Sequence, residues 1–219
     1  MFFRDYVRVV LCFAALFPLS GQSAVNDIFP ADFFPLPPET HVVTTYLFDK
    51  TSSGPFSAGT QSADWKVKSQ SVVLRFAKFK DWNGTTVAGS LVGGFSQQDL
   101  SGQGIPDSIN RSASGLRDVR LNATAWLINY PESREYLALN TTWMLPSGQY
   151  SSGEAQNIGE YRHQLALTMA WLKGIGHRWN LELIGEVAGY SPNSSFFTGD
   201  PRIGTVKQTK AAKHNTTRT

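Results

Sequence analysis

The chain has 219 residues, of which 41% are hydrophobic, and 20 basic against 17 acidic residues give it a net charge of +3. Basic residues gather near the end of the chain, so the charge is no evidence for nucleic-acid binding. Cys12 is the only cysteine, and no later stretch approaches the ~18 continuous apolar residues of a transmembrane helix. These properties exclude a disulfide-stabilised domain and a bundle of membrane helices.

Two segments are predicted to precede the strands. A basic start, the apolar run 9–19 and the small residues after it form the pattern of a secretory signal, so residues 1–23 are expected to be cleaved on export. The run is too short to span a bilayer as a helix. Residues 24–40 hold four prolines and three phenylalanines. Since proline cannot donate to a strand ladder, this leader is expected to lie against or inside the fold.

The first three predicted strands alternate apolar and polar side chains, the pattern of a strand with one apolar face. They are residues 41–48, 71–80 and 85–95. Asn83-Gly84 between the last two is a strong signal for a tight hairpin. The polar segments 49–68 and 96–115 are expected to be long loops.

Four further strands follow between Asp118 and Tyr190, and each alternates apolar and polar residues over about ten positions. They are residues 118–127, 137–145, 162–171 and 179–190. The segments between them are predicted to be a tight turn at 131–134, a long loop at 146–159 and a tight turn at 174–177.

The predicted connections alternate between long and short. Outer-membrane barrels have this asymmetry because tight turns lie at the periplasmic rim and extended loops at the external rim. Strands of about ten residues can also cross an outer membrane when tilted. The sequence therefore predicts an all-β fold: an antiparallel up-and-down transmembrane β-barrel of the outer-membrane type over residues 41–190, with the lipid bilayer as its partner.

A soluble antiparallel barrel or sandwich shows the same alternation, so the pattern alone leaves this alternative open. Two features favour the membrane barrel. Aromatic residues near the strand ends of the apolar faces would form an interfacial girdle, whereas the opposite faces carry charges and amides at mid-strand positions. The aromatic residues are Trp143, Tyr161, Trp171 and Trp179.

The end of the chain departs from a complete barrel. Seven strands are predicted, whereas single-chain bacterial barrels have an even number and close on themselves. Residues 191–219 form a polar, basic tail, which is expected to be disordered or atypical. The prediction is a C-terminally incomplete barrel, whose unpaired edge strands would promote aggregation.

Short motifs between residues 114 and 190 carry a resemblance to a known family. They are Gly115-Leu116 with Asp118, Trp126-Leu127, residues 145–150, residues 157–162, Gly174 with Gly176, and much of 179–190. With these motifs the chain resembles the MetA-pathway of phenol degradation proteins, which are exported by Gram-negative bacteria. The resemblance implies an outer-membrane channel for aromatic or other hydrophobic compounds.

The candidate functional residues are those whose strand parity points into the lumen. Such side chains tune which solutes pass, through charge and hydrogen bonding. The alternative for the same residues is structural filling of a narrow barrel. The candidates are Arg75, Asp118, Arg120, Asn122, Trp126, Tyr136, Asn140, Arg162, Glu182, Glu186 and Tyr190.

No enzyme chemistry, metal or cofactor is predicted. His163 has the lipid-facing parity, His177 falls in a turn, and no G-x-S-x-G elbow occurs. The histidines also lack metal-ligand spacing. Asn122 and Asn140 lie in glycosylation sequons, but their strand positions indicate amides of the lumen.

The leading hypothesis is an outer-membrane channel or transporter-like protein for small hydrophobic or aromatic compounds. The alternative is a non-transporting structural or binding barrel of the cell envelope, soluble in the periplasm or set in the membrane. That alternative predicts a lumen packed shut by the leader. No nucleic-acid partner is expected.

Overall fold

The computed structural model of the protein describes residues 28, 31–57, 60–107, 109–193, 195–197, 205–206 and 214–218. All regular secondary structure in these ranges is β-strand. No helix within them is long and apolar enough to cross a membrane. The predicted signal at 1–23 lies outside the described residues.

Nine strands form one antiparallel sheet. They are β1 (His41–Ser57), β2 (Thr60–Trp82), β3 (Thr85–Gly102), β4 (Ser112–Leu116), β5 (Arg120–Tyr130), β6 (Glu135–Met144), β7 (Gln164–Ile175), β8 (Trp179–Tyr190) and β11 (His214–Arg218). Their order is β1-β2-β3-β5-β6-β7-β8-β11, with β4 on β3. A separate two-stranded sheet pairs β9 (Phe196–Phe197) with β10 (Thr205–Val206). The predicted up-and-down topology is confirmed.

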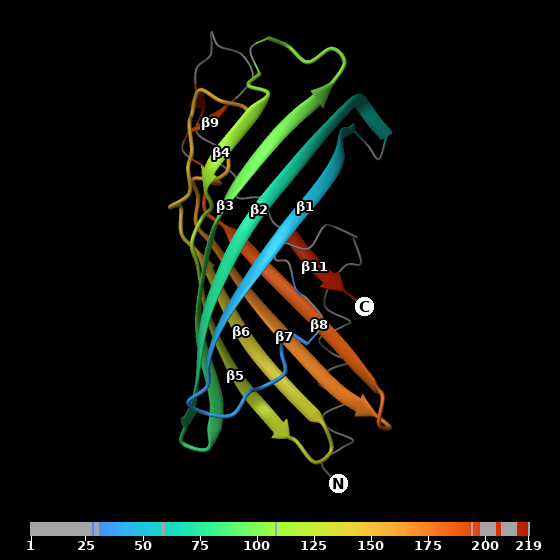
Figure 1. Ribbon diagram of the computed structural model, residues 1–219, viewed down its shortest axis with the longest axis vertical. Coiled ribbons are helices and arrows are strands. Elements are labelled where there is room, and N and C mark those ends of the chain that lie inside the picture. Colours follow the sequence, from blue (N-terminus) through green and yellow to red (C-terminus); the bar gives the residue numbers. More distant parts are fainter. Residues whose placement is uncertain are drawn as a thin grey trace.

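The large sheet curls into the shape of half a barrel (Figure 1). Among the described residues β1 pairs with β2 alone, so the sheet is open at that edge. β1, β2 and β3 rise to the upper end in Figure 1, whereas the three tight turns lie at the lower end. The face on the inside of the curl is called the inner face below, and the opposite one the outer face.

The three tight turns lie where the sequence predicts them. Asn83 and Gly84 both have positive φ, 52° and 82°, as a two-residue type I′ hairpin requires. Turn residues occupy 131–134 and 176–178. Each of these turns joins two strands that are neighbours in the sheet.

The two long loops predicted in the first half are wrong. β1 continues to Ser57 and β2 begins at Thr60, so most of 49–68 is a paired extension of this hairpin. In 96–115, β3 runs on to Gly102 and β4 adds a strand. Backbone ladders do not require apolar side chains, and a hairpin with two polar faces therefore lacks the alternation that marks a strand.

Boundaries elsewhere also differ from the sequence pattern. Arg162, predicted to open a strand, precedes β7, which begins at Gln164. Asp118 precedes β5, which begins at Arg120. Residues 214–218 of the predicted tail form β11, which pairs with β8. No apolar alternation marks that segment, so the pattern does not foresee the strand.

The four consecutive strands β5 to β8 have 11, 10, 12 and 12 residues. About 9–11 residues suffice for a tilted strand to cross the hydrocarbon core. β2 has 23 residues, roughly twice that length. The long hairpins therefore extend beyond the layer that β5 to β8 define.

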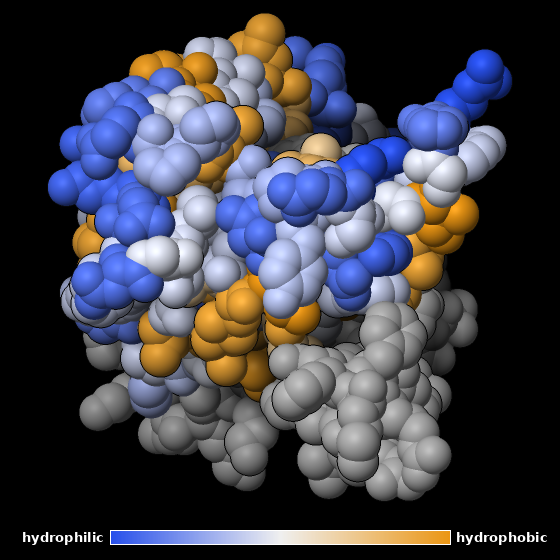
Figure 2. Space-filling view, turned by 90° about the horizontal axis from the view of Figure 1, so that it is seen from below, coloured by the Kyte–Doolittle hydropathy of each residue, from blue (hydrophilic) through white to orange (hydrophobic). Residues whose placement is uncertain are grey.

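The outer face is more apolar than the inner face, as the sequence predicts. On β7 the outer Leu165 is 59% exposed, whereas the inner Thr168 is 1% exposed. Figure 2 looks onto the end with the tight turns, where hydrophilic residues gather, and shows apolar patches on the flanks. Exposed apolar residues of the outer face include Val43, Leu47, Leu74, Phe76, Leu91, Leu121, Leu127, Leu139, Leu167 and Leu183.

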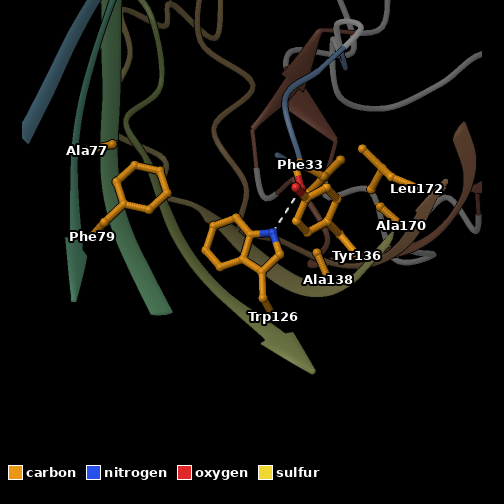
Figure 3. Packing of buried hydrophobic residues seen from close by; sticks show 8 residues of the cluster. All are labelled: Phe33, Ala77, Phe79, Trp126, Tyr136, Ala138, Ala170 and Leu172. Atoms are coloured by element: carbon orange, nitrogen blue, oxygen red, sulfur yellow. Dashed lines mark hydrogen bonds between the residues drawn. The ribbon is translucent and has the colours of Figure 1, made fainter. Parts of the chain in front are cut away.

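An apolar cluster fills the lower part of the inner face (Figure 3). Its members are Phe33, Ala77, Phe79, Trp126, Tyr136, Ala138, Ala170 and Leu172. Phe33 belongs to the leader, so a segment from outside the sheet lies within the curl. The indole Nε1 of Trp126 donates to the Phe33 carbonyl oxygen at 2.8 Å, and the ring of Phe34 meets that of Tyr136 edge-on at 5.3 Å.

The polarity of the faces yields a stability prediction. Leu121→Arg places a charge on the outer face, and near the middle of a bilayer this should cost about 2–4 kcal/mol. Leu121→Met, which keeps that face apolar, should leave the urea midpoint of the protein in lipid vesicles nearly unchanged. Asn122→Ser, one position along on the inner face, should cost far less than Leu121→Arg. Equal costs for the charged and the apolar change at Leu121 would contradict a lipid-facing outer face.

Candidate functional site

A cavity of about 120 Å³ lies against the inner face. Its walls come from β1, β2, β3, β5, β6, β7, β8 and the leader. The lining residues are Ile28, Asp32, Phe33, Tyr46, Phe48, Val73, Arg75, Val92, Gly93, Arg117, Asp118, Arg120, Asn122, Thr124, Asn140, Thr142, Thr168 and Glu186. An apolar cavity of about 150 Å³ accommodates benzene, so this space is on the scale of one aromatic ring.

The strand register arranges the polar inner residues in rows across the sheet. One row passes through Thr44, Arg75, Val92, Arg120, Met144, Gln164 and Tyr190, each opposite the next. A second passes through Ser90, Asn122 and Thr142, and a third through Thr124, Asn140, Thr168 and Glu186. Because facing residues in a row share one side of the sheet, their side chains all point into the curl.

Amides and hydroxyls of the last two rows bind one another. Asn122 Nδ2 donates to Ser90 Oγ at 3.0 Å, and Thr142 Oγ1 donates to Asn122 Oδ1 at 2.7 Å. Thr124 Oγ1 donates to Asn140 Oδ1 at 2.9 Å, while Asn140 Nδ2 donates to Thr142 Oγ1 at 3.1 Å. These bonds fix the polar wall in place, since buried amides and hydroxyls need partners.

Asp118 connects the cavity wall to the long segment after β6. Its Oδ1 accepts the Gly148 N–H and its Oδ2 the Glu160 N–H, both at 2.7 Å. A Cβ at Gly148 would lie 2.7 Å from the Asp118 backbone nitrogen, and one at Gly159 would lie 2.8 Å from the Gly148 carbonyl carbon. The two glycines therefore let the backbones approach closely enough for the carboxylate to reach both donors.

The remaining charged groups of the wall are also placed by neighbours. Arg75 Nη1 lies 3.4 Å from Asp32 Oδ1 of the leader. Arg117 Nη1 donates to Ser71 Oγ at 3.2 Å and to Ser96 Oγ at 3.1 Å. Glu186 Oε2 accepts from Thr168 Oγ1 at 2.9 Å. Three arginines and three acids thus line the cavity, and Arg75 and Asp32 form an ion pair among them.

Six of the candidates predicted from the sequence line this cavity. They are Arg75, Asp118, Arg120, Asn122, Asn140 and Glu186. The other five lie elsewhere. Trp126 and Tyr136 pack in the apolar cluster. Glu182 accepts the Ala31 N–H at 3.2 Å. Arg162 is paired with Glu160 at 2.7 Å and lies 4.3 Å above the Tyr190 ring.

Several lining residues escape the sequence analysis. Thr124, Thr142 and Thr168 share the polar parity of their strands, and that signal could have found them. Arg117 lies outside a strand, where parity has no meaning. Asp32 belongs to the leader, and no periodicity in the sequence indicates where the leader runs.

Metal and acid–base chemistry find little support in this geometry. The described ranges hold no group of three or more His, Cys, Asp or Glu residues that could bind a metal. His163 is exposed on the outer face, where its Nδ1 accepts from Trp143 Nε1 at 3.3 Å. His177 lies in the turn before β8.

A solved structure has a similar fold. It is an outer-membrane channel from Pseudomonas putida, with a TM-score of 0.72 and 24% sequence identity. The match covers 78% of this chain and 64% of the channel, so the chain spans slightly less than two thirds of the channel's length. At this identity the likeness is one of fold. No curated protein sequence matches the chain.

A family model gives the broader match. The family is described as "Putative MetA-pathway of phenol degradation", and its model matches residues 50–216. This range includes every strand from β2 to β10 and all the motifs that carry the resemblance. The chain therefore belongs to the family of the MetA pathway of phenol degradation.

Proposed function

We propose that this protein is an outer-membrane β-barrel channel that admits small hydrophobic or aromatic solutes. One observation carries the proposal: the sheet is apolar on its outer face and polar on its inner face. A soluble barrel or sandwich would bury its apolar face and expose its polar one. An exposed apolar face this extensive fits a lipid environment, because soluble proteins rarely show one.

The strand ends support the same environment. Trp143 and Trp179 are 45% and 74% exposed on the outer face. Each lies within one residue of the end of its strand. Aromatic side chains favour the interface between lipid and water, so these residues suit the rims of the membrane layer.

The second candidate is a barrel that binds a ligand or has a structural role and transports no solute. The leader favours it, since Phe33 and Phe34 pack inside the curl against Trp126 and Tyr136. A leader fixed there would close the lower part of the lumen. The cavity above it would then be a binding site and no part of a continuous path.

Location and transport are tested together. We expect the protein to fractionate with the outer membrane and to increase the flux of phenol into liposomes more than the flux of a hydrophilic solute of similar size. The reason is that the inner wall pairs apolar and hydrogen-bonding surface around a ring-sized space. Empty liposomes and liposomes with Leu121→Arg protein serve as controls. Recovery in the soluble periplasmic fraction would contradict the membrane location.

The leader distinguishes the two candidates. Phe33→Ala removes the leader's buried ring from the apolar cluster, and deletion of residues 25–34 removes the whole inner contact. If the leader restricts the lumen of a channel, both changes should increase phenol flux, with the deletion having the larger effect. Leu36→Ala, in an exposed part of the leader, is the matched control and should leave flux unchanged. Flux that stays at zero in all variants would favour the non-transporting barrel.

A further inference from the structure

Donors without acceptors lie along one row of the inner face. Arg75 Nε and Gln164 Nε2 are buried and have no hydrogen-bond partner. Arg120 lies between them in the register, and its guanidinium has neither a hydrogen bond nor an ion pair within the described chain. These donors leave room for an acceptor that the described residues do not supply, since buried polar groups are almost always paired.

Two of these donors face the same cavity. Arg75 and Arg120 both line it, and Val92 separates them in the row. Adjacent strands lie about 4.8 Å apart, so the two arginine Cα atoms lie about 10 Å from each other. Side chains as long as arginine can converge on one small group across that gap.

Among the described residues, no acid of the cavity forms an ion pair with Arg120. Asp118 is occupied by two backbone N–H groups at 2.7 Å, and Glu186 accepts from Thr168. Asp32 is paired with Arg75. A half-buried guanidinium without a directly bound partner is unfavourable, and an anionic ligand would supply one.

Part of the wall is apolar. Phe33, Phe48, Val73 and Val92 line the same space, whose volume of about 120 Å³ suits one ring. Guanidinium groups bind carboxylates through two parallel hydrogen bonds. We propose that the cavity is a binding site for a single-ring aromatic carboxylate, with the carboxylate on Arg120 and the ring against the apolar wall. This rests on the proposed function and narrows its solute class from small hydrophobic or aromatic compounds to single-ring aromatic carboxylates.

Calorimetric titration of the full-length protein in detergent tests the site. Benzoate is the probe, benzyl alcohol its neutral counterpart and acetate the anion without a ring. Benzoate should bind more tightly than either. Arg120→Gln should weaken benzoate by about 10- to 100-fold, the range expected for hydrogen bonds to a charged group, and Arg120→Lys should weaken it less. Arg178→Gln, an exposed charge in the turn before β8, should leave the affinity unchanged.

Two outcomes would overturn the proposal. One is that benzyl alcohol or acetate binds as tightly as benzoate. The other is that Arg120→Gln, with a circular dichroism spectrum like that of the parent protein, keeps full benzoate affinity. If Arg120→Gln does not fold, the ratio of benzoate to benzyl alcohol affinity in the parent and in Arg120→Lys decides. Binding in detergent requires no transport, so zero flux in liposomes combined with benzoate binding would reject the channel and keep the site.

Discussion

The structure depends on the pairing of every strand of β5 to β8 with a neighbour on each side. In hydrocarbon an unpaired backbone N–H or C=O costs several kcal/mol, so a strand is tolerated there only within a continuous ladder. The antiparallel pairing of β3, β5, β6, β7 and β8 supplies that ladder, with one register shift between Trp126 and Ile128 of β5. Once the backbone is satisfied, the outer side chains are free to be apolar and the inner ones to be polar.

The inside of the curl has two parts: the apolar cluster fills one, and the cavity occupies the other. Below, Trp126 donates one hydrogen bond to the leader and shares the apolar cluster with Phe33. Above, small hydroxyl and amide side chains such as Thr142 and Asn122 leave space that larger residues would occupy. The same register that aligns these residues also aligns Arg75 with Arg120. In the proposed channel, the side chains that a solute meets are therefore those that lie opposite one another on neighbouring strands.

Much of the fold follows from the sequence, because side-chain parity and tight turns are local signals. Alternation places Leu121 outside and Asn122 inside, and Asn83-Gly84 sets a hairpin register. The polar extension of β1 and β2 leaves no such signal, since polar residues predominate on both of its faces. The site is less predictable for a similar reason. Parity shows that Trp126 and Arg120 point inward, but only the path of the leader decides which of them packs against protein and which lines the cavity.

The two hydrogen bonds of Asp118 have a consequence for the order of folding. The carboxylate reaches backbone groups 30 and 42 residues further along the chain, and joining such distant segments costs loop-closure entropy. The pairing of β5 with β6 and of β6 with β7 brings these segments together before the contact forms and removes most of that cost. The Asp118 contacts are therefore expected to form after these strands have paired.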